Sequence, residues 1–149
     1  MASASLNRMS VLPDPTTPFG DRVARRLREE PVIWFTSISR DGTPQPNPVW
    51  FWWDGESFLV FNRRDAGRVK HVASRPRVAL HFDGNGRGGD IVVFTGTAEV
   101  ARDEPPPHAH PGYADKYREG IRRVSASPEA FSEEYPVPLR VRPDRVRGF

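Results

Sequence analysis

The chain has 149 residues, of which 37% are hydrophobic and 28% charged, a composition typical of one globular domain. Its net charge is +3, and the absence of cysteine excludes disulfides, thiolate metal sites and a cysteine nucleophile. No run approaches the ~18 apolar residues of a membrane span, and the first residues lack the apolar stretch of a signal peptide. We therefore expect a cytoplasmic protein with no membrane partner.

The N-terminal part of the chain divides into an arm and a helix. Residues 1–17 are polar and contain prolines, which predicts a flexible arm before a single domain over residues 18–149. Thr17 followed by Pro18 is typical of a helix N-cap and first turn. Apolar residues follow at helical spacing, so a helix is predicted to about Glu30.

The remainder of the chain is dominated by short strands. Runs rich in strand-forming residues predict six strands, at about residues 32–39, 45–53, 57–62, 78–82, 91–101 and 139–146. Helical spacing predicts short helices over residues 66–74, 113–124 and 128–135. Tight hairpin signals such as Asp54-Gly55 favour a mainly β (α+β) fold, a six-stranded antiparallel barrel, over a doubly wound fold.

The segment Val49-Trp50-Phe51-Trp52-Trp53 is apolar on both faces of its predicted strand. A strand with one solvated face alternates apolar and polar residues, so both faces of this strand must be covered. One face suits the barrel interior, and the other calls for a second subunit, a planar ligand or both. The alternative interpretation is an ordinary core strand.

A basic segment, Asn62-Arg63-Arg64-Asp65-Ala66-Gly67-Arg68-Val69-Lys70, runs from the end of the third predicted strand into a helix. Helix N-termini attract anions through free backbone N–H groups and the helix dipole, and the basic side chains add full charges. The segment is therefore a candidate phosphate site, with a solvated helix start as the alternative.

Three other patterns carry weaker signals. Residues 84–89 contain G-x-G-x-x-G, but a strand follows them instead of a helix, so we interpret them as a hairpin loop. His108 and His110 lie among prolines without a third ligand at suitable spacing, which argues against a metal site. The tail 140–147 alternates basic and apolar residues, which directs its arginines toward an anionic ligand tail or toward solvent.

Five motifs occur in a characteristic order between Phe19 and the C-terminus. They are Ser39-Arg40-Asp41-Gly42-Thr43-Pro44, Pro48-Val49-Trp50-Phe51 with Asp54-Gly55, Gly67-Arg68-Val69-Lys70-His71-Val72, Arg75-Pro76-Arg77-Val78 and Gly96-Thr97-Ala98-Glu99-Val100. In this order the sequence resembles the split-barrel flavin-binding (FMN-binding-like) superfamily typified by pyridoxamine 5'-phosphate oxidase. It resembles most closely the branch of deazaflavin (coenzyme F420)-dependent enzymes.

The resemblance implies a homodimer with two cofactor sites across the subunit interface, and hydride transfer between the cofactor and a small-molecule substrate. By resemblance, the cofactor ring would lie against Asn47, Pro48, Val49, Trp50 and Phe51. Its ribityl chain would pass Phe61, Asn62, Arg63 and Arg64, and its phosphate would bind Arg68 and Lys70. Because the cofactor itself carries the hydride, no catalytic side chain is named.

Alternatives to an F420-dependent oxidoreductase remain at this point. The surplus of arginine favours F420, whose oligoglutamate tail is anionic, over FMN. An FMN-dependent oxidase or reductase and a non-catalytic flavin or F420 carrier are the other candidates. The substrate-phosphate motif of the biosynthetic oxidase is not found, which argues against pyridoxamine phosphate as substrate. Nucleic acid is not expected as a partner, because the aromatic residues cluster in a strand that must be buried.

Overall fold

The computed structural model describes residues 10–149, so residues 1–9 of the predicted N-terminal arm lie outside the described residues. Within the remainder of the arm, Leu12 packs against the barrel core. The Asp14 carboxylate accepts hydrogen bonds from the Thr16 N–H and hydroxyl at 2.9 and 2.7 Å. The Leu12 contact attaches this part of the arm to the domain, and the Asp14–Thr16 bonds shape the turn before the first helix.

Helix α2 (Pro18–Glu29) begins where the sequence predicts. The Thr17 hydroxyl accepts the Gly20 N–H at 3.0 Å, and proline occupies the first turn, where its missing N–H has no cost. Val23 and Leu27 lie on one face of the helix and are buried. Their burial fixes α2 against the barrel.

Seven strands form one antiparallel sheet in the order β2-β1-β5-β6-β7-β4-β3. The mainly β class with short helices is confirmed, and residues 84–89 form the loop of the antiparallel β5–β6 hairpin, as predicted. The strands are β1 (Ile33–Ile38), β2 (Pro44–Val49), β3 (Trp52–Trp53), β4 (Phe58–Asn62), β5 (Arg77–His81), β6 (Val92–Val100) and β7 (Val137–Gly148).

The predicted count of six strands is wrong, because the strand expected over residues 45–53 divides into β2 and β3. Between them, the Phe51 N–H donates to the Tyr117 hydroxyl at 2.8 Å. The Phe51 carbonyl accepts from the Lys116 ammonium, also at 2.8 Å. Side chains from a later helix thus satisfy the backbone groups that a neighbouring strand would otherwise pair.

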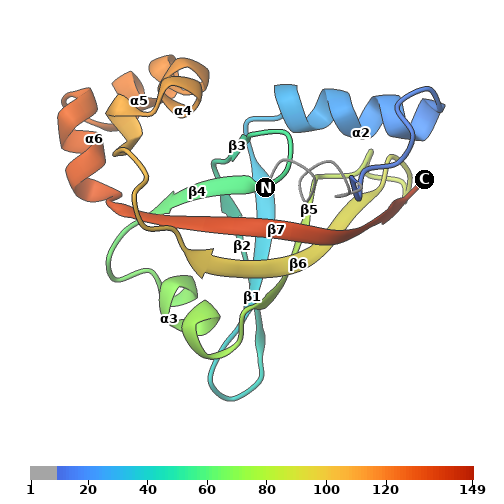
Figure 1. The fold of residues 1–149 in the computed structure, drawn as a ribbon, viewed down its shortest axis with the longest axis horizontal. Coiled ribbons are helices and arrows are strands. Elements are labelled where there is room, and N and C mark those ends of the chain that lie inside the picture. The colour runs from blue at the N-terminus through green and yellow to red at the C-terminus, as the bar shows by residue number, and fades with distance from the viewer. Residues whose placement is uncertain (1–9) are drawn as a thin grey trace, which may run out of the picture.

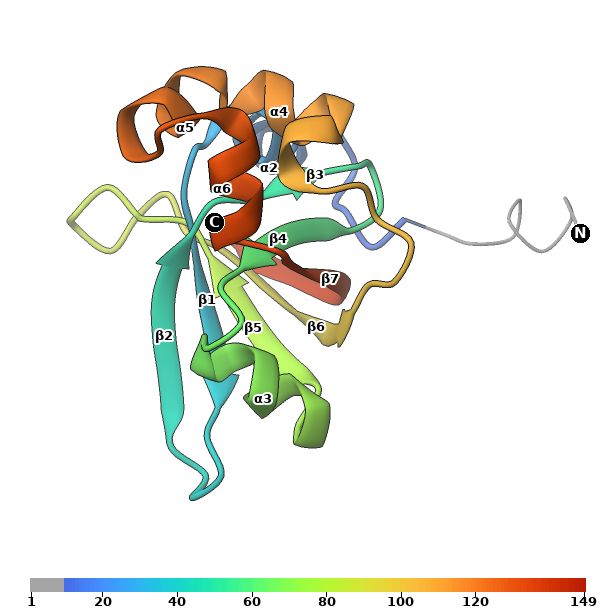
Figure 2. The same ribbon diagram turned by 90° about the vertical axis from the view of Figure 1, so that its left-hand side faces the viewer.

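The sheet closes on itself as a split barrel. β2 and β3 lie at opposite edges of the sheet, yet only Trp50 and Phe51 separate them along the chain. The two edges must therefore approach each other, and the twisted sheet curls around its core (Figure 1, Figure 2). Ile33, Phe35 and Phe94 are among the fully buried side chains that fill the interior.

The β2 edge of the barrel is rich in proline. Pro44, Pro46 and Pro48 alternate along the strand, which places the positions without an N–H on the side that faces away from β1. Residues 44–48 are also exposed. This edge has no N–H donors with which to add a further strand, so a partner here could not form a regular β-ladder with β2.

Five short helical segments complete the domain: α3 (Gly67–Ser74), the 3-10 turn η1 (Pro107–Ala109), α4 (Pro111–Lys116), α5 (Arg118–Val124) and α6 (Pro128–Glu134). The helix predicted over residues 113–124 divides at Tyr117, whose backbone φ and ψ of −109° and 16° are not helical. Both views show α4–α6 gathered at one end of the barrel and α3 at the other (Figure 1, Figure 2). Among residues 10–149, no helix is long and apolar enough to cross a membrane.

The outer face of the tryptophan-rich segment is covered by the chain itself. Trp50 stacks on Tyr117 with ring centroids 4.6 Å apart and planes 1° apart, and on Phe131 at 5.7 Å. A Cβ on Gly112 would lie 2.2 Å from the Trp52 indole, so glycine lets α4 approach that ring closely. α4–α6 therefore supply much of the cover that this face needs, while Trp50, Trp52 and Trp53 stay partly exposed, so a second subunit or a planar ligand on this face stays a prediction.

Candidate cofactor-binding site

A cavity of about 430 Å³ lies between α3 on one side and helices α4–α6 on the other, with residues of β2 and β4 completing its lining. It brings together six of the eleven residues proposed from the sequence: Pro48, Val49, Trp50, Phe61, Arg63 and Arg68. The other lining residues are Ala66, Tyr113, Val124, Phe131 and Tyr135. We call this space the aromatic cavity.

One wall of the aromatic cavity is built from rings that pack against one another. Phe61 meets Tyr113 edge to face with centroids 4.8 Å apart, and Phe131 stacks on Tyr135 at 4.7 Å. Trp50 joins this cluster through its stack on Phe131. Interlocked rings lose little freedom when a flat ligand binds, so the wall is preorganised for an aromatic partner.

Arg68 supplies the half-buried positive charge of the cavity. Its Nε donates a hydrogen bond to the Asn62 side-chain oxygen, and it forms no ion pair with any described residue. Burial lowers the pKa of Arg68, while the neighbouring Tyr135 opposes that shift. A partly buried guanidinium without a counter-ion is costly, and an anion in the cavity would relieve that cost.

Asn62 holds Arg68 in place and does not line the cavity. It is fully buried, and its amide donates to the backbone carbonyls of Val60 and Val137 at 2.9 and 3.1 Å. These two bonds fix the side-chain oxygen toward Arg68. Within the chain Asn62 therefore positions Arg68, and its predicted contact with a ligand stays a prediction.

The other two arginines of the basic segment lie farther from the aromatic wall. Arg63 is more than half exposed at the cavity rim, 5.7 Å over the Tyr135 ring, and pairs with Asp65 at 3.8 Å. Arg64 lines a different hollow, beside the acidic residues Glu129 and Glu133. The structure therefore brings Arg63 to the candidate site but leaves Arg64 outside it.

Lys70 lies on the opposite side of α3 from Arg68. It lines an open cleft, which we call the basic cleft, formed by Ser39, Arg40, Asp41, Gly67, Lys70, His71, Ser74 and Arg75. An α-helix turns about 100° per residue, so side chains two positions apart point in nearly opposite directions. That Arg68 and Lys70 hold one phosphate together stays a prediction, and within one chain they line separate cavities.

Two further predicted residues lie outside the aromatic cavity. Asn47 is on the exposed part of β2. The Phe51 side chain is fully buried in the barrel core, where it packs against Phe58 and Phe82. Its backbone groups are also engaged by α4, so neither part of Phe51 faces the cavity.

The sequence analysis missed the contribution of the C-terminal helices to the cavity. Tyr113, Phe131 and Tyr135 follow β4 by more than fifty residues, yet they form much of the aromatic wall. The available signal was the spacing of Phe131 and Tyr135, which lie four residues apart. This spacing predicts that the two rings share one face of a helix and that this face packs against another part of the protein. Burial, followed by the nearby Tyr117 and Tyr135, raises the pKa of Tyr113 well above its ordinary value, so it stays a neutral phenol.

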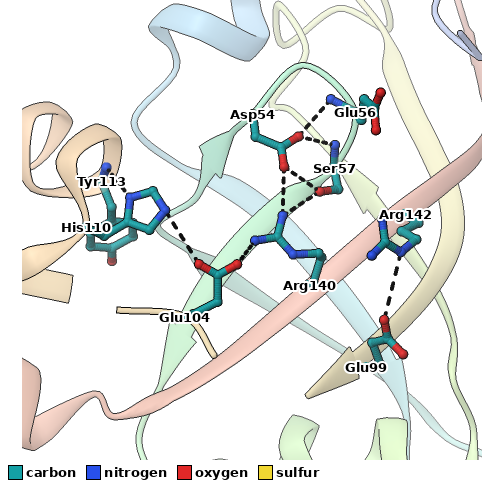
Figure 3. A network of polar contacts seen from close by, with 9 residues as sticks. All are labelled: Asp54, Glu56, Ser57, Glu99, Glu104, His110, Tyr113, Arg140 and Arg142. Carbon is teal, nitrogen blue, oxygen red and sulfur yellow. Dashed lines mark hydrogen bonds and ion pairs between the residues drawn. The ribbon is translucent and has the colours of Figure 1, made fainter. Parts of the chain in front are cut away.

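The C-terminal arginines do not converge on the aromatic cavity. Arg140 donates to Asp54 at 2.8 Å and to the Ser57 hydroxyl at 2.7 Å, and it also pairs with Glu104 (Figure 3). Glu104 lies 3.8 Å from His110, whose Nδ1 caps α4. This set, the Arg140 network, ties β7, the β3–β4 turn and η1 together and leaves Arg140 engaged by acids of its own chain.

The two histidines near η1 have structural contacts. His110 belongs to the Arg140 network, and the His108 ring lies 2.7 Å from the Ser132 hydroxyl. Over the part of the chain that the structure describes, no group of three or more His, Cys, Asp or Glu residues is arranged to hold a metal ion.

Comparison with known proteins identifies a family for this chain and solved structures with the same fold. The family model described as pyridoxamine 5'-phosphate oxidase matches residues 19–146, while no curated protein matches the chain. Among solved structures, the chain is similar to an F420 reductase, with 24% identity, a TM-score of 0.61, and coverage of 83% of this chain and 94% of that one.

Two further structures share the fold at lower identity. General stress protein 26 from Bacillus anthracis has 16% identity and a TM-score of 0.63, over 85% of this chain and 89% of that one. The heme storage protein HutZ from Vibrio cholerae has 12% identity and a TM-score of 0.62, over 89% of this chain and 95% of that one. With its family match over the whole barrel, the chain belongs to the pyridoxamine 5'-phosphate oxidase family, within the split-barrel flavin-binding superfamily.

Proposed function

We propose that this protein is an F420-dependent oxidoreductase that binds its deazaflavin in the aromatic cavity and reduces a small organic substrate. The observation that carries the proposal is the Arg68 guanidinium, half-buried beside an aromatic wall with no acidic partner among the described residues. A cofactor that joins a flat ring to a phosphate satisfies both features at once. Neither an apolar nor a purely anionic ligand would do so.

The dimensions of the cavity support this assignment. Its volume of about 430 Å³ is within the range of small-molecule pockets, roughly 300–1,000 Å³. The rings of Trp50, Phe61 and Tyr135 would face the cofactor ring, and Arg68, at the uncapped start of α3, would hold the phosphate. The remainder of the cofactor would extend toward the open side.

The lining residues suit a site that binds and orients without proton transfer. The bound deazaflavin would supply the hydride chemistry. The ionisable groups in the lining are Arg63, Arg68, Tyr113 and Tyr135, and the raised pKa of Tyr113 keeps its proton in place. The protein would contribute an apolar wall that excludes water and a fixed cation that sets the position of the ring.

The basic cleft supports F420 over FMN. Gly67, Lys70, His71 and Ser74 line one stripe of α3 toward it, at the spacing of residues that share a helix face. Arg40, Lys70 and Arg75 form no ion pair with another described residue, so the cleft, which also contains Asp41, carries net positive charge on the side of α3 away from Arg68. The oligoglutamate tail of F420 provides carboxylates that FMN lacks.

We also propose that the working unit is a homodimer. The exposed residues of β2, including Asn47 and Pro48, flank the aromatic cavity and offer a surface for a second copy. The proline pattern of this edge means that such a copy would pack through side chains rather than extend the sheet. Sedimentation velocity tests this directly, and a monomer at micromolar concentration would contradict it.

Fluorescence titration with oxidised F420 tests the cofactor assignment. We expect saturable binding at micromolar concentrations and weaker binding of FMN. Tight FMN uptake with no F420 binding would instead favour an FMN-dependent oxidase or reductase. Stopped-flow oxidation of bound reduced F420 by quinones, nitro-compounds and enones distinguishes enzyme from carrier, because a carrier would not exceed the rate of the free cofactor.

A further inference from the structure

A second cavity, of about 340 Å³, lies between α2, β3 and α4 and shares no lining residue with the aromatic cavity. Its wall contains two indoles, one arginine and one lysine. The lining residues are Leu27, Arg28, Trp52, Trp53, Gly112, Asp115 and Lys116. We call this space the lysine cavity.

Lys116 is one of the lining residues, and its amine is held in a defined position. Its Nζ donates to the Phe51 carbonyl at 2.8 Å and lies 3.6 Å from the centroid of the Phe51 ring. The carbonyl and the ring face each stabilise the ammonium weakly, and no described carboxylate forms an ion pair with it. The group is thus anchored but not neutralised.

The charges around Lys116 come from the two helices that border the cavity. From α2 come Arg28, which lines the cavity without a described ion-pair partner, and Glu30 just beyond the helix end. From α4 comes Asp115, which pairs with Arg118 at 3.3 Å. Burial lowers the pKa of Lys116 to about 8, and Glu30 opposes the shift, so about one amine in ten is unprotonated at pH 7.

We propose that Lys116 is a reactive amine that forms an imine with small aromatic aldehydes carrying an anionic group. The aldehyde carbon would meet Nζ, the aromatic ring would lie against the Trp52 and Trp53 indoles, and the anionic group would pair with Arg28. Each of the three parts of such a molecule then has a partner in the cavity lining. Aldehyde capture here is independent of the cofactor proposed for the aromatic cavity.

The chemistry needs only the free amine and the aldehyde. The lone pair of Nζ attacks the carbonyl carbon, and a proton passes from nitrogen to the carbonyl oxygen to give a carbinolamine. Loss of water forms the carbon–nitrogen double bond, so one aldehyde and one amine become one imine and one water. The amine is nucleophilic only when unprotonated, which is why its partial desolvation matters.

The test exploits the fact that the chain has only two lysines, Lys70 and Lys116. The full protein is treated with 4-carboxybenzaldehyde and cyanoborohydride at pH 7.5, and peptide mass spectrometry follows each lysine separately. We expect Lys116 to be labelled at least tenfold faster than the exposed Lys70. Equal rates, or faster labelling of Lys70, would overturn the proposal.

Two matched controls separate recognition from simple reactivity. Arg28→Ala should slow labelling of Lys116 by 4-carboxybenzaldehyde severalfold, but leave its labelling by uncharged benzaldehyde unchanged. Lys116→Arg should remove the fast-labelled peptide while Lys70 reacts as before, and an unchanged denaturant midpoint would show that the variant is folded. If Arg28→Ala changes neither rate, the assignment of the anionic subsite is refuted.

Discussion

Replacement of Arg68 by methionine tests the central assignment of the aromatic cavity. Methionine keeps an unbranched apolar stem, although a shorter one, and removes the charge and the hydrogen bonds that a phosphate would accept. Hydrogen bonds to charged groups contribute about 1.5–3 kcal/mol, so the dissociation constant for F420 should rise about 10- to 150-fold. The magnitude should lie toward the upper limit because Arg68 is half-buried and solvent screens it incompletely.

The assay is F420 fluorescence titration of Arg68→Met beside Lys70→Met and Arg64→Met. Arg64 lines a separate hollow, so its replacement should leave the affinity unchanged. Lys70 borders the basic cleft, and its replacement should weaken F420 more than FMN if the cleft holds the anionic tail.

The stability of the unliganded Arg68→Met protein shows whether a loss of F420 affinity reflects a lost contact or a damaged fold. Arg68→Met removes a half-buried cation without an acidic partner but leaves the Asn62 oxygen without its donor, and these effects offset each other. We expect the free energy of unfolding to change by less than about 1 kcal/mol. Unaltered F420 affinity in a stably folded Arg68→Met protein would refute the phosphate assignment.

Three further predictions concern stability, each measured by denaturant unfolding. Gly112→Ala should lower the free energy of unfolding by about 1–3 kcal/mol, because its methyl group would overlap the Trp52 indole. The control is Gly86→Ala, which strains only its own exposed loop and leaves α4 in place. Arg140→Met should lower the free energy of unfolding by about 3 kcal/mol at neutral pH, because it leaves the mostly buried carboxylates of Asp54 and Glu104 without their cation. Burial raises the pKa of Asp54, but backbone and side-chain hydrogen bonds and the charge of Arg140 together lower it, so the loss should shrink as the pH falls; a loss independent of pH would contradict the account. Burial lowers the pKa of Lys116 from 10.5 to about 8, so between these pH values the unfolded chain holds a proton on Lys116 that the folded chain has lost. The free energy of unfolding of the wild type should therefore rise relative to that of Lys116→Met from about pH 8 to about pH 10. A difference between the two proteins that does not change with pH would contradict the lowered pKa.

Local sequence patterns determined the elements and the fold class. The Thr17-Pro18 pair fixed the start of α2 because capping involves only neighbouring residues. Short β-rich runs joined by tight turns gave the antiparallel sheet, and the strand after residues 84–89 excluded a dinucleotide fold. Each of these conclusions depends on groups a few residues apart, where backbone geometry leaves few choices.

Contacts between distant segments decided the rest. The strand predicted over residues 45–53 breaks at Phe51 because Lys116 and Tyr117 bind its backbone, and no pattern within that strand reveals this. The helices that cover Trp50 were predicted as elements, but their docking position was not.

The basic segment shows both what a sequence pattern can predict about a side chain and what it cannot. The sequence alone identified this segment as the start of a helix rich in positive charge. Helical geometry also predicts that the side chains of Arg68 and Lys70 point in nearly opposite directions. Only the tertiary structure shows that Arg68 faces an aromatic wall built from α4–α6 while Lys70 faces the β1–β2 turn. A sequence pattern specifies the direction of a side chain from its own helix, but what lies in that direction depends on how the whole chain folds.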